Sequence, residues 1–174
     1  MQSEKIEAFV LRHKNLLKKD QIVTLFSQEH GRISVIAKGI RSLTSKRIAH
    51  IQTGNLIRAH ISQHQSGTYL QSTHLLSGFV KIKTETKLEV LYKLLFILNA
   101  LLPDGQREDA VYHLTKRFFI ALSKENDDPQ TIFFTYLYDI MKALGYVSGR
   151  LNRDDLLKTV EKNIGKTLPK RVII

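Results

Sequence analysis

Residues 21–38 read QIVTLFSQEHGRISVIAK, and this stretch decides the fold of the first half of the chain. Its two ends, 21–27 and 32–38, are rich in the β-branched and aromatic residues that are typical of strands. The residues between them, Gln28-Glu29-His30-Gly31, have the composition of a turn in which Gly31 supplies a positive φ. The stretch therefore predicts a β-hairpin.

Three further strands are expected around this hairpin. One covers residues 6–12, and a second hairpin joins 55–63 to 68–74 across the turn Gln65-Ser66-Gly67. The basic, polar connector between the two hairpins has room for a short helix around 45–51. Five strands within about 75 residues predict a small closed barrel, and the five-stranded oligonucleotide-binding (OB) barrel is one solution.

Pleat alternation gives two of these strands an apolar face and a basic or polar face. The apolar sets are Ile33, Val35 and Ala37 in one strand and Ile57, Ala59 and Ile61 in the other. Arg32 and Lys38 lie on the opposite face of the first strand, and Arg58 on that of the second. Tyr69, on the next strand, adds an aromatic ring. Cations beside an aromatic platform are typical of a groove for single-stranded nucleic acid.

The second half of the chain changes to helical periodicity. We expect one helix to run from Thr84 or Thr86 to about Leu102, and a second to cover 108–123. A third starts at Asp128-Pro129, an N-cap acid followed by proline, and a shorter fourth starts at Asn152. The chain is thus predicted to be α+β, with an OB barrel in residues 1–80 and an all-α domain in residues 81–174.

The charge of the chain is unevenly distributed. The 174 residues contain 27 Lys+Arg against 16 Asp+Glu, a net charge of +11, and no acidic residue lies between Glu29 and Glu85. An acid-free stretch of this length favours a binding surface for a polyanion. The longest apolar run is too short to span a membrane, and the N-terminus lacks the pattern of a signal peptide. We therefore expect a cytoplasmic protein.

Catalytic and metal sites are not predicted. The chain has no Cys, and so no disulfide or cysteine zinc site. Gly165-Lys166-Thr167 resembles the end of a phosphate loop, but Val160 occupies the position that the motif reserves for Gly. His60 and His64 have no acidic residue nearby in sequence to complete a metal site. We expect no enzyme activity, no cofactor and no metal.

The sequence resembles the RecO family. The resemblance covers roughly residues 5–147 and is carried by 9–12, 23–27, 30–41 and 45–47, and, in the helical half, by 91–105 and 138–147. The segment GRISVIAKGIR, residues 31–41, is its most specific part. Two features depart from the family pattern: the cysteine zinc module of many members cannot form here, and the chain stops soon after the third long helix, as in a short or shortened member.

The resemblance implies a non-enzymatic mediator of DNA repair and homologous recombination, located with the nucleoid. Such a protein binds single- and double-stranded DNA without sequence preference and anneals complementary strands. With RecR it helps to load RecA onto DNA coated by the single-strand-binding protein SSB, whose acidic tail it contacts. The matching motif contains Lys38, Gly39 and Arg41. The candidate DNA-binding residues are Arg32, Lys38, Gly39, Arg41, Lys46, Arg47, Arg58 and Tyr69.

Two other functions are open at this point. The helical half can act as an interaction module if a cation beside an apolar pocket holds the terminal carboxylate of an acidic peptide such as the SSB tail. The candidates are Lys116 and Arg117 beside Phe118 and Phe119, or Lys142 near Tyr138 and Tyr146, although these aromatic residues equally suit a helix core. The barrel can also bind RNA, because the charge pattern does not separate RNA from DNA.

Overall fold

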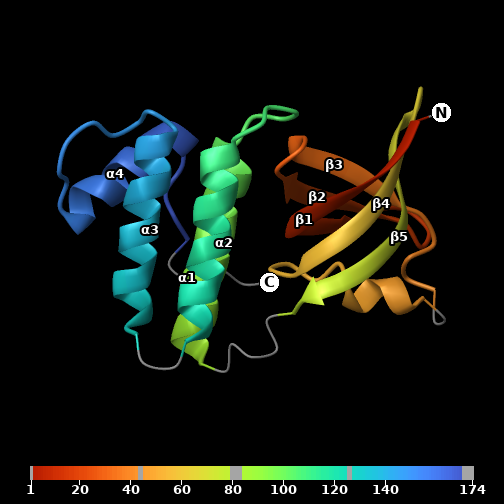
Figure 1. Ribbon diagram of the computed structural model, residues 1–174, viewed down its shortest axis with the longest axis horizontal. Helices are drawn as coiled ribbons and strands as arrows, with labels where there is room; N and C mark the ends of the chain where they lie inside the picture. Colours follow the sequence, from red (N-terminus) through yellow and green to blue (C-terminus); the bar gives the residue numbers. More distant parts are fainter. Residues whose placement is uncertain (1, 43–44, 79–83, 125–126, 170–174) are drawn as a thin grey trace. The chain divides into compact units, whose positions relative to one another are not determined.

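The computed structural model describes residues 2–42, 45–78, 84–124 and 127–169. The chain divides into two compact units. The first contains Met1–Phe79 together with Leu102–Arg107, and the second contains Val80–Leu101 and Glu108–Ile174. The boundary expected between residues 80 and 81 falls outside the described residues. The first unit holds five strands, and the second holds four α-helices within its described part (Figure 1).

The first unit is a closed barrel whose strands follow the order β1-β2-β3-β5-β4. The strands are β1 (Gln2–Asn15), β2 (Gln21–Ser27), β3 (Gly31–Ala37), β4 (Leu56–His64) and β5 (Gly67–Ser77). Neighbouring strands are antiparallel except β3 and β5, which run parallel. This is the topology of an OB barrel. The predicted fold class, an OB barrel followed by helices, is confirmed.

The first strand is much longer than the expected 6–12. Its beginning pairs with β4, from Gln2 opposite Gln63 onward, and its end pairs with β2, up to Asn15 opposite Gln21. Ala8 and Phe9 pair with both strands, and a bulge between Val10 and Arg12 follows this overlap. Exposed charged side chains near both ends interrupt the apolar alternation by which a strand is predicted from sequence. Both ends nevertheless pair with neighbouring strands. The extra length lets a single strand close the barrel.

The barrel core contains the apolar face that pleat alternation predicts. Val35, Ala37, Ile57 and Ala59 are completely buried, and Ile33 packs against them. The connector between β3 and β4, which includes the short helix η1 (Lys46–Ala49), adds Ile40 and Ile51 to the same core. Burying a side chain of this size contributes about 1.5–3 kcal/mol. The connector is therefore held against the barrel by its own apolar residues.

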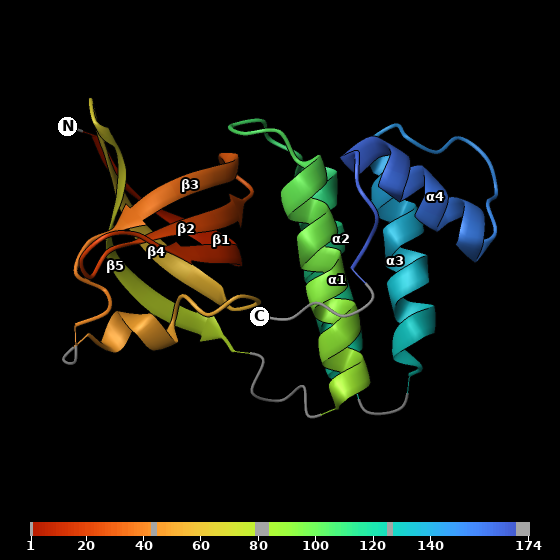
Figure 2. The ribbon, with the colours of Figure 1, turned by 180° about the vertical axis from the view of Figure 1, so that it is seen from behind.

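The second unit is built around α3 (Pro129–Ala143), which packs against α1 (Glu85–Leu101), α2 (Asp109–Ser123) and α4 (Arg153–Ile164), while α1 also packs against α4. Helices α2 and α3 lie side by side in both opposite views (Figures 1 and 2). Helix α1 buries Val90, Leu91, Leu94, Leu95, Ile97, Leu98 and Leu101. Within the described residues, no helix has the length and apolar character needed to cross a membrane.

The helices begin where the sequence predicts. Thr84, not Thr86, caps α1, since its hydroxyl accepts a hydrogen bond from the backbone N–H of Lys87 at 3.3 Å. The Asp128 carboxylate accepts from the backbone N–H of Thr131 at 2.9 Å, with Pro129 in the first turn of α3. Asn152 caps α4 in the same way. The hydrogen bonds from Thr131 hold the pKa of Asp128 below its ordinary value.

The segment 102–107 links α1 to α2 but belongs to the barrel unit. Arg32 and Asp104 form an ion pair at 3.1 Å, and the backbone N–H of Gly105 donates to the carbonyl of Arg32 at 2.8 Å. Gly31 has φ +63°, and a Cβ atom at this position would lie 1.7 Å from the carbonyl oxygen of Gln106. Only glycine therefore allows this segment to approach β3.

Gly31→Ala and Gly39→Ala form a matched pair that tests this approach. Both glycines have nearly the same φ, +63° and +61°, but nothing lies within 4 Å of a Cβ at Gly39. Gly39→Ala should lower the free energy of unfolding by about 1–2 kcal/mol, the cost of a left-handed L-residue. Gly31→Ala should cost clearly more because of the added clash. Equal urea unfolding curves for the two variants would show that the 102–107 segment does not pack against Gly31.

Removing the N-cap of α3 should destabilise the helical unit. Asp128→Ala should lower the melting temperature by about 2–4 °C, whereas Asp128→Asn, which keeps a capping oxygen, should lose less. Because the folded-state pKa of Asp128 lies below its ordinary value of 3.8, its stabilisation is present above that pH and is lost as the pH falls further. Circular dichroism melting at pH 7 and below pH 3.8 measures both effects. An Asp128→Ala variant as stable as Asp128→Asn at pH 7 would contradict the capping role.

Candidate nucleic-acid interface

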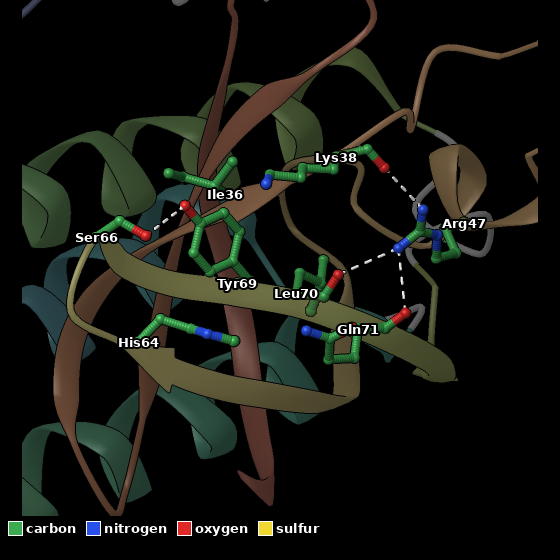
Figure 3. Close-up of a pocket in the computed structure, with 8 residues that line it drawn as sticks. All are labelled: Ile36, Lys38, Arg47, His64, Ser66, Tyr69, Leu70 and Gln71. Carbon is green, nitrogen blue, oxygen red and sulfur yellow. Dashed lines mark hydrogen bonds between the residues drawn. The ribbon is translucent and has the colours of Figure 1, made fainter. Parts of the chain in front are cut away.

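A pocket of about 460 Å³ lies on the barrel surface where β3 ends and β5 begins (Figure 3). Residues from β3, the β3–β4 connector, the end of β4 and the start of β5 surround it. They are Ile36, Lys38, Arg47, His64, Ser66, Tyr69, Leu70 and Gln71. None of these described residues is acidic. The pocket therefore combines cations, one aromatic ring and hydrogen-bonding groups.

Tyr69 lies at the centre of the pocket, opposite Ile36 in the parallel pairing of β3 with β5. The Lys38 ammonium lies 4.5 Å from the centroid of the Tyr69 ring, in a cation–π contact. A 3.0 Å hydrogen bond joins the Tyr69 hydroxyl to Ser66, and His64 contacts the ring in a T-shaped arrangement with centroids 5.2 Å apart. These contacts orient the ring, and they place a positive charge beside it. Such a pair can bind a nucleobase and its phosphate together.

The Arg47 guanidinium contacts three backbone carbonyl groups (Figure 3). It donates to Leu70 and Gln71 of β5, each at 3.1 Å, and to Lys38 at the end of β3, at 2.9 Å. A guanidinium presents several donors in a fixed fork, which suits such bridging. Arg47 thus fastens the connector and both strands around the pocket, while its positive charge remains in the pocket wall.

Gly39 and Arg41 fasten the loop between β1 and β2. The backbone N–H of Gly39 donates to the Asp20 carboxylate at 2.8 Å. The Arg41 guanidinium donates to the carbonyl of Leu16 at 3.2 Å and also to that of Lys18. The residues that follow Lys38 therefore connect the pocket to the β1–β2 loop.

The other expected DNA-binding residues are distributed around the barrel. Arg32 lies at the start of β3, the opposite end from Lys38, and pairs with Asp104. Arg58 is exposed on β4, in register with Glu7 of β1 and His74 of β5. Lys46 begins η1, and its side chain lies outside the described residues. The structure thus brings together Lys38, Arg47 and Tyr69, with Gly39 and Arg41 adjacent in the chain.

His64 and Ser66 line this pocket but are not among the residues predicted from the sequence. Both lie at the turn between β4 and β5, within five residues of Tyr69 in the chain. A tight hairpin brings residues on either side of its turn together, so the turn sequence contained the necessary information. The contact with Lys38 depends instead on the parallel pairing of β5 with β3, which no local pattern reveals.

Two histidines of β4 form hydrogen bonds with serine side chains. The ring nitrogen Nε2 of His60 is hydrogen-bonded to Ser3, and that of His64 to Ser62 at 3.0 Å. Within the described ranges, no group of three or more His, Cys, Asp or Glu side chains is placed to hold a metal ion.

The cations predicted for partner binding lie on two helices. Arg117 on α2 and Lys142 on α3 are exposed, and Lys116 is half-buried. Phe118 and Phe119 are buried in the helical core, which supports the core interpretation of these two rings over a role in a peptide pocket. Tyr138 donates a hydrogen bond to the carbonyl of Gly149 at 3.1 Å, and Tyr146 is exposed.

The barrel topology and the pocket define the class of this protein. It is an OB-fold protein with an aromatic ring and cations at the β3–β5 seam, followed by a helical unit. The family model described as "Recombination protein O N terminal" matches residues 1–79. The barrel unit of this chain therefore matches the N-terminal domain of the RecO family.

Several proteins named "DNA repair protein RecO" are similar to most of the chain. The one from Caldanaerobacter subterraneus subsp. tengcongensis is 26% identical over 144 residues, covering 82% of this chain and 58% of its own length. The one from Thermoanaerobacter sp. is 25% identical with the same coverage. The one from Alteromonas mediterranea is 27% identical over 132 residues, covering 76% of this chain and 56% of its own. The chain therefore spans a little over half the length of these curated relatives.

Replacing Arg47 should weaken the barrel as well as the pocket. Arg47→Ala removes its hydrogen bonds to three carbonyls and should lower the free energy of unfolding by about 2–3 kcal/mol. Arg47→Lys, which keeps the charge but lacks the fork, should give an intermediate loss. The exposed Arg58→Ala is the control and should change stability by less than about 0.5 kcal/mol. Urea unfolding that leaves Arg47→Ala as stable as Arg58→Ala would contradict the fastening role.

Proposed function

We propose that this protein acts in DNA repair and homologous recombination by binding single-stranded DNA without sequence preference through the barrel pocket. The observation that carries the proposal is the Lys38–Tyr69 pair, a cation 4.5 Å from an aromatic ring in a pocket whose described lining has no carboxylate. The match of residues 1–79 to the RecO family favours DNA as the nucleic acid.

The chemistry of such binding needs no base-specific contact. An unpaired base stacks on Tyr69, and a neighbouring phosphate pairs with the Lys38 ammonium. Every base has a π-face, so stacking tolerates any sequence. Each phosphate neutralised by Lys or Arg releases condensed counterions, so the affinity falls as salt is added. The net charge of +11 favours association with any nucleic acid, including duplex DNA.

Strand annealing and recombinase loading extend this function. Neutralising the phosphates of two complementary strands lets them approach while their bases remain able to pair, and the protein performs no chemical step of its own. RecR, the SSB tail and, indirectly, RecA are the proposed partners. These partners are supported by the family alone. Arg117 and Lys142 are exposed cations that can pair with an acidic peptide such as the SSB tail.

Fluorescence anisotropy of a labelled strand of ~30 nucleotides, titrated at several salt concentrations, tests DNA binding. The logarithm of the affinity should fall linearly with the logarithm of the salt concentration, by about 0.7 for each phosphate contacted. An RNA strand of the same sequence is the competitor. Absence of binding at low salt, or clearly tighter binding of RNA, would contradict the proposal.

Two pocket variants should lose affinity for different reasons. Tyr69→Leu removes base stacking and should weaken binding about tenfold without changing the salt dependence. Lys38→Gln removes a phosphate contact and should reduce the salt slope by about 0.7. Lys158→Gln, the same charge change at an exposed position of α4, is the control and should bind like the original protein. If Tyr69→Leu and Lys38→Gln both bind DNA as tightly as this control, the binding surface lies outside the pocket.

A further inference from the structure

The tip of the β1–β2 loop carries the most exposed large apolar side chain of the described chain. Leu17 is 90% exposed, whereas the next most exposed, Ile120, is 56% exposed. Scattered exposed apolar residues are ordinary, but a leucine that is 90% exposed buries little of its surface in the barrel. Its neighbours Lys18 and Lys19 are both exposed cations.

The loop that presents Leu17 is fixed by many hydrogen bonds. The backbone N–H of Leu16 donates to the Asp20 carbonyl at 3.0 Å, and the backbone N–H of Arg41 donates to the Lys19 carbonyl at 3.1 Å. The Arg41 side chain adds bonds to the carbonyls of Leu16 and Lys18. These contacts come from both sides of Leu17. The leucine is therefore presented by an ordered backbone.

Lys18 has φ +62° and is the one non-glycine residue with positive φ among the described residues. A lysine in the left-handed region is strained, and such a backbone conformation persists where surrounding contacts hold it. Here the hydrogen bonds from Arg41 to the loop carbonyls hold the conformation of Lys18. A glycine would adopt the turn without strain but would not carry the cation next to Leu17.

The loop and the pocket share one structural support. Lys38 points into the pocket, the next residue, Gly39, donates to Asp20 of the loop, and Arg41 holds the loop backbone. Residues 38–41 therefore connect the pocket directly to the loop that carries Leu17. The cations at the tip provide attraction for phosphates on either side of an inserted side chain.

We propose that Leu17 is an apolar wedge that inserts between stacked bases of DNA where a duplex meets a single strand. Proteins that deform nucleic acid use leucine in this way, with cations to hold the adjoining phosphates. Tyr69 takes the unpaired base, and Leu17 separates the first paired step. This assignment rests on the proposed DNA binding and adds a preference for the junction.

A forked duplex with 2-aminopurine at its first paired position tests the wedge. Binding of the full chain should raise the 2-aminopurine fluorescence, since insertion of Leu17 unstacks this base. Leu17→Ala should abolish the increase and weaken binding to the fork about tenfold, the loss expected when an apolar group of this size is no longer buried. Its affinity for a single strand should change less than about twofold, and Leu17→Met should restore both properties of the fork complex.

Two control variants separate the wedge from charge and from general surface effects. Lys19→Gln should weaken binding to fork and single strand equally, because it removes a phosphate contact. Ile120→Ala, which removes an exposed apolar side chain from α2, should leave both affinities unchanged.

The outcomes distinguish the wedge from the proposed function. If Leu17→Ala binds the fork like the original protein, the wedge is wrong while DNA binding stands. If Leu17→Ala changes the oligomeric state measured by sedimentation but not the affinity for the fork, the loop tip is a protein contact. That result would also contradict the wedge proposal. If neither fork nor single strand binds at low salt, the proposed function itself fails.

Discussion

The three hydrogen bonds of Arg47 hold the part of the barrel on which the candidate site depends. β3 and β5 pair at a single described register position, Ile36 with Tyr69, so the parallel seam is the least paired joint of the barrel. Arg47 bonds both sides of this seam, at Lys38 and at Leu70 and Gln71. A seam with few backbone pairs leaves space for a pocket between β3 and β5. The hydrogen bonds of Arg47 hold the two strands together beside this pocket. Fold closure and the shape of the proposed binding pocket therefore depend on the same side chain.

The basic residues of the barrel divide by what they contact. Arg41 and Arg47 donate to backbone carbonyls, and Arg32 pairs with Asp104, so all three have structural roles. Lys38 instead contacts the aromatic ring of Tyr69. In the proposed complex a phosphate would take the place of the ring as the partner of the Lys38 ammonium, and a base would stack on the ring. This division agrees with the chemistry of the two cations: the guanidinium fork bridges several acceptors, and the ammonium is a mobile point charge. Several cations of the acid-free stretch therefore stabilise the barrel itself.

The sequence was sufficient for elements defined by local patterns. Both hairpins, the Asp128-Pro129 helix start and the inward face of β3 were predicted because alternation, turn residues and caps act within a few residues. β1 was underestimated because its ends carry charged side chains although they pair on the barrel. Lys38, Arg47 and Tyr69 were chosen for their chemistry, but their proximity comes from the β3–β5 pairing. The roles of Arg32 and Arg41 could not be predicted, since Asp104 and the loop carbonyls that they contact are distant in sequence.

We propose that DNA binds at the β3–β5 seam and the β1–β2 loop. Amide chemical shifts of the isotopically labelled protein, recorded while an unlabelled thymidine oligonucleotide is added, locate the binding surface because they report on both units at once. We expect the perturbed amides to concentrate at 16–20, 36–41 and 64–71, with the helical unit little affected. Perturbations confined to α2 and α3, with the seam unchanged, would contradict it.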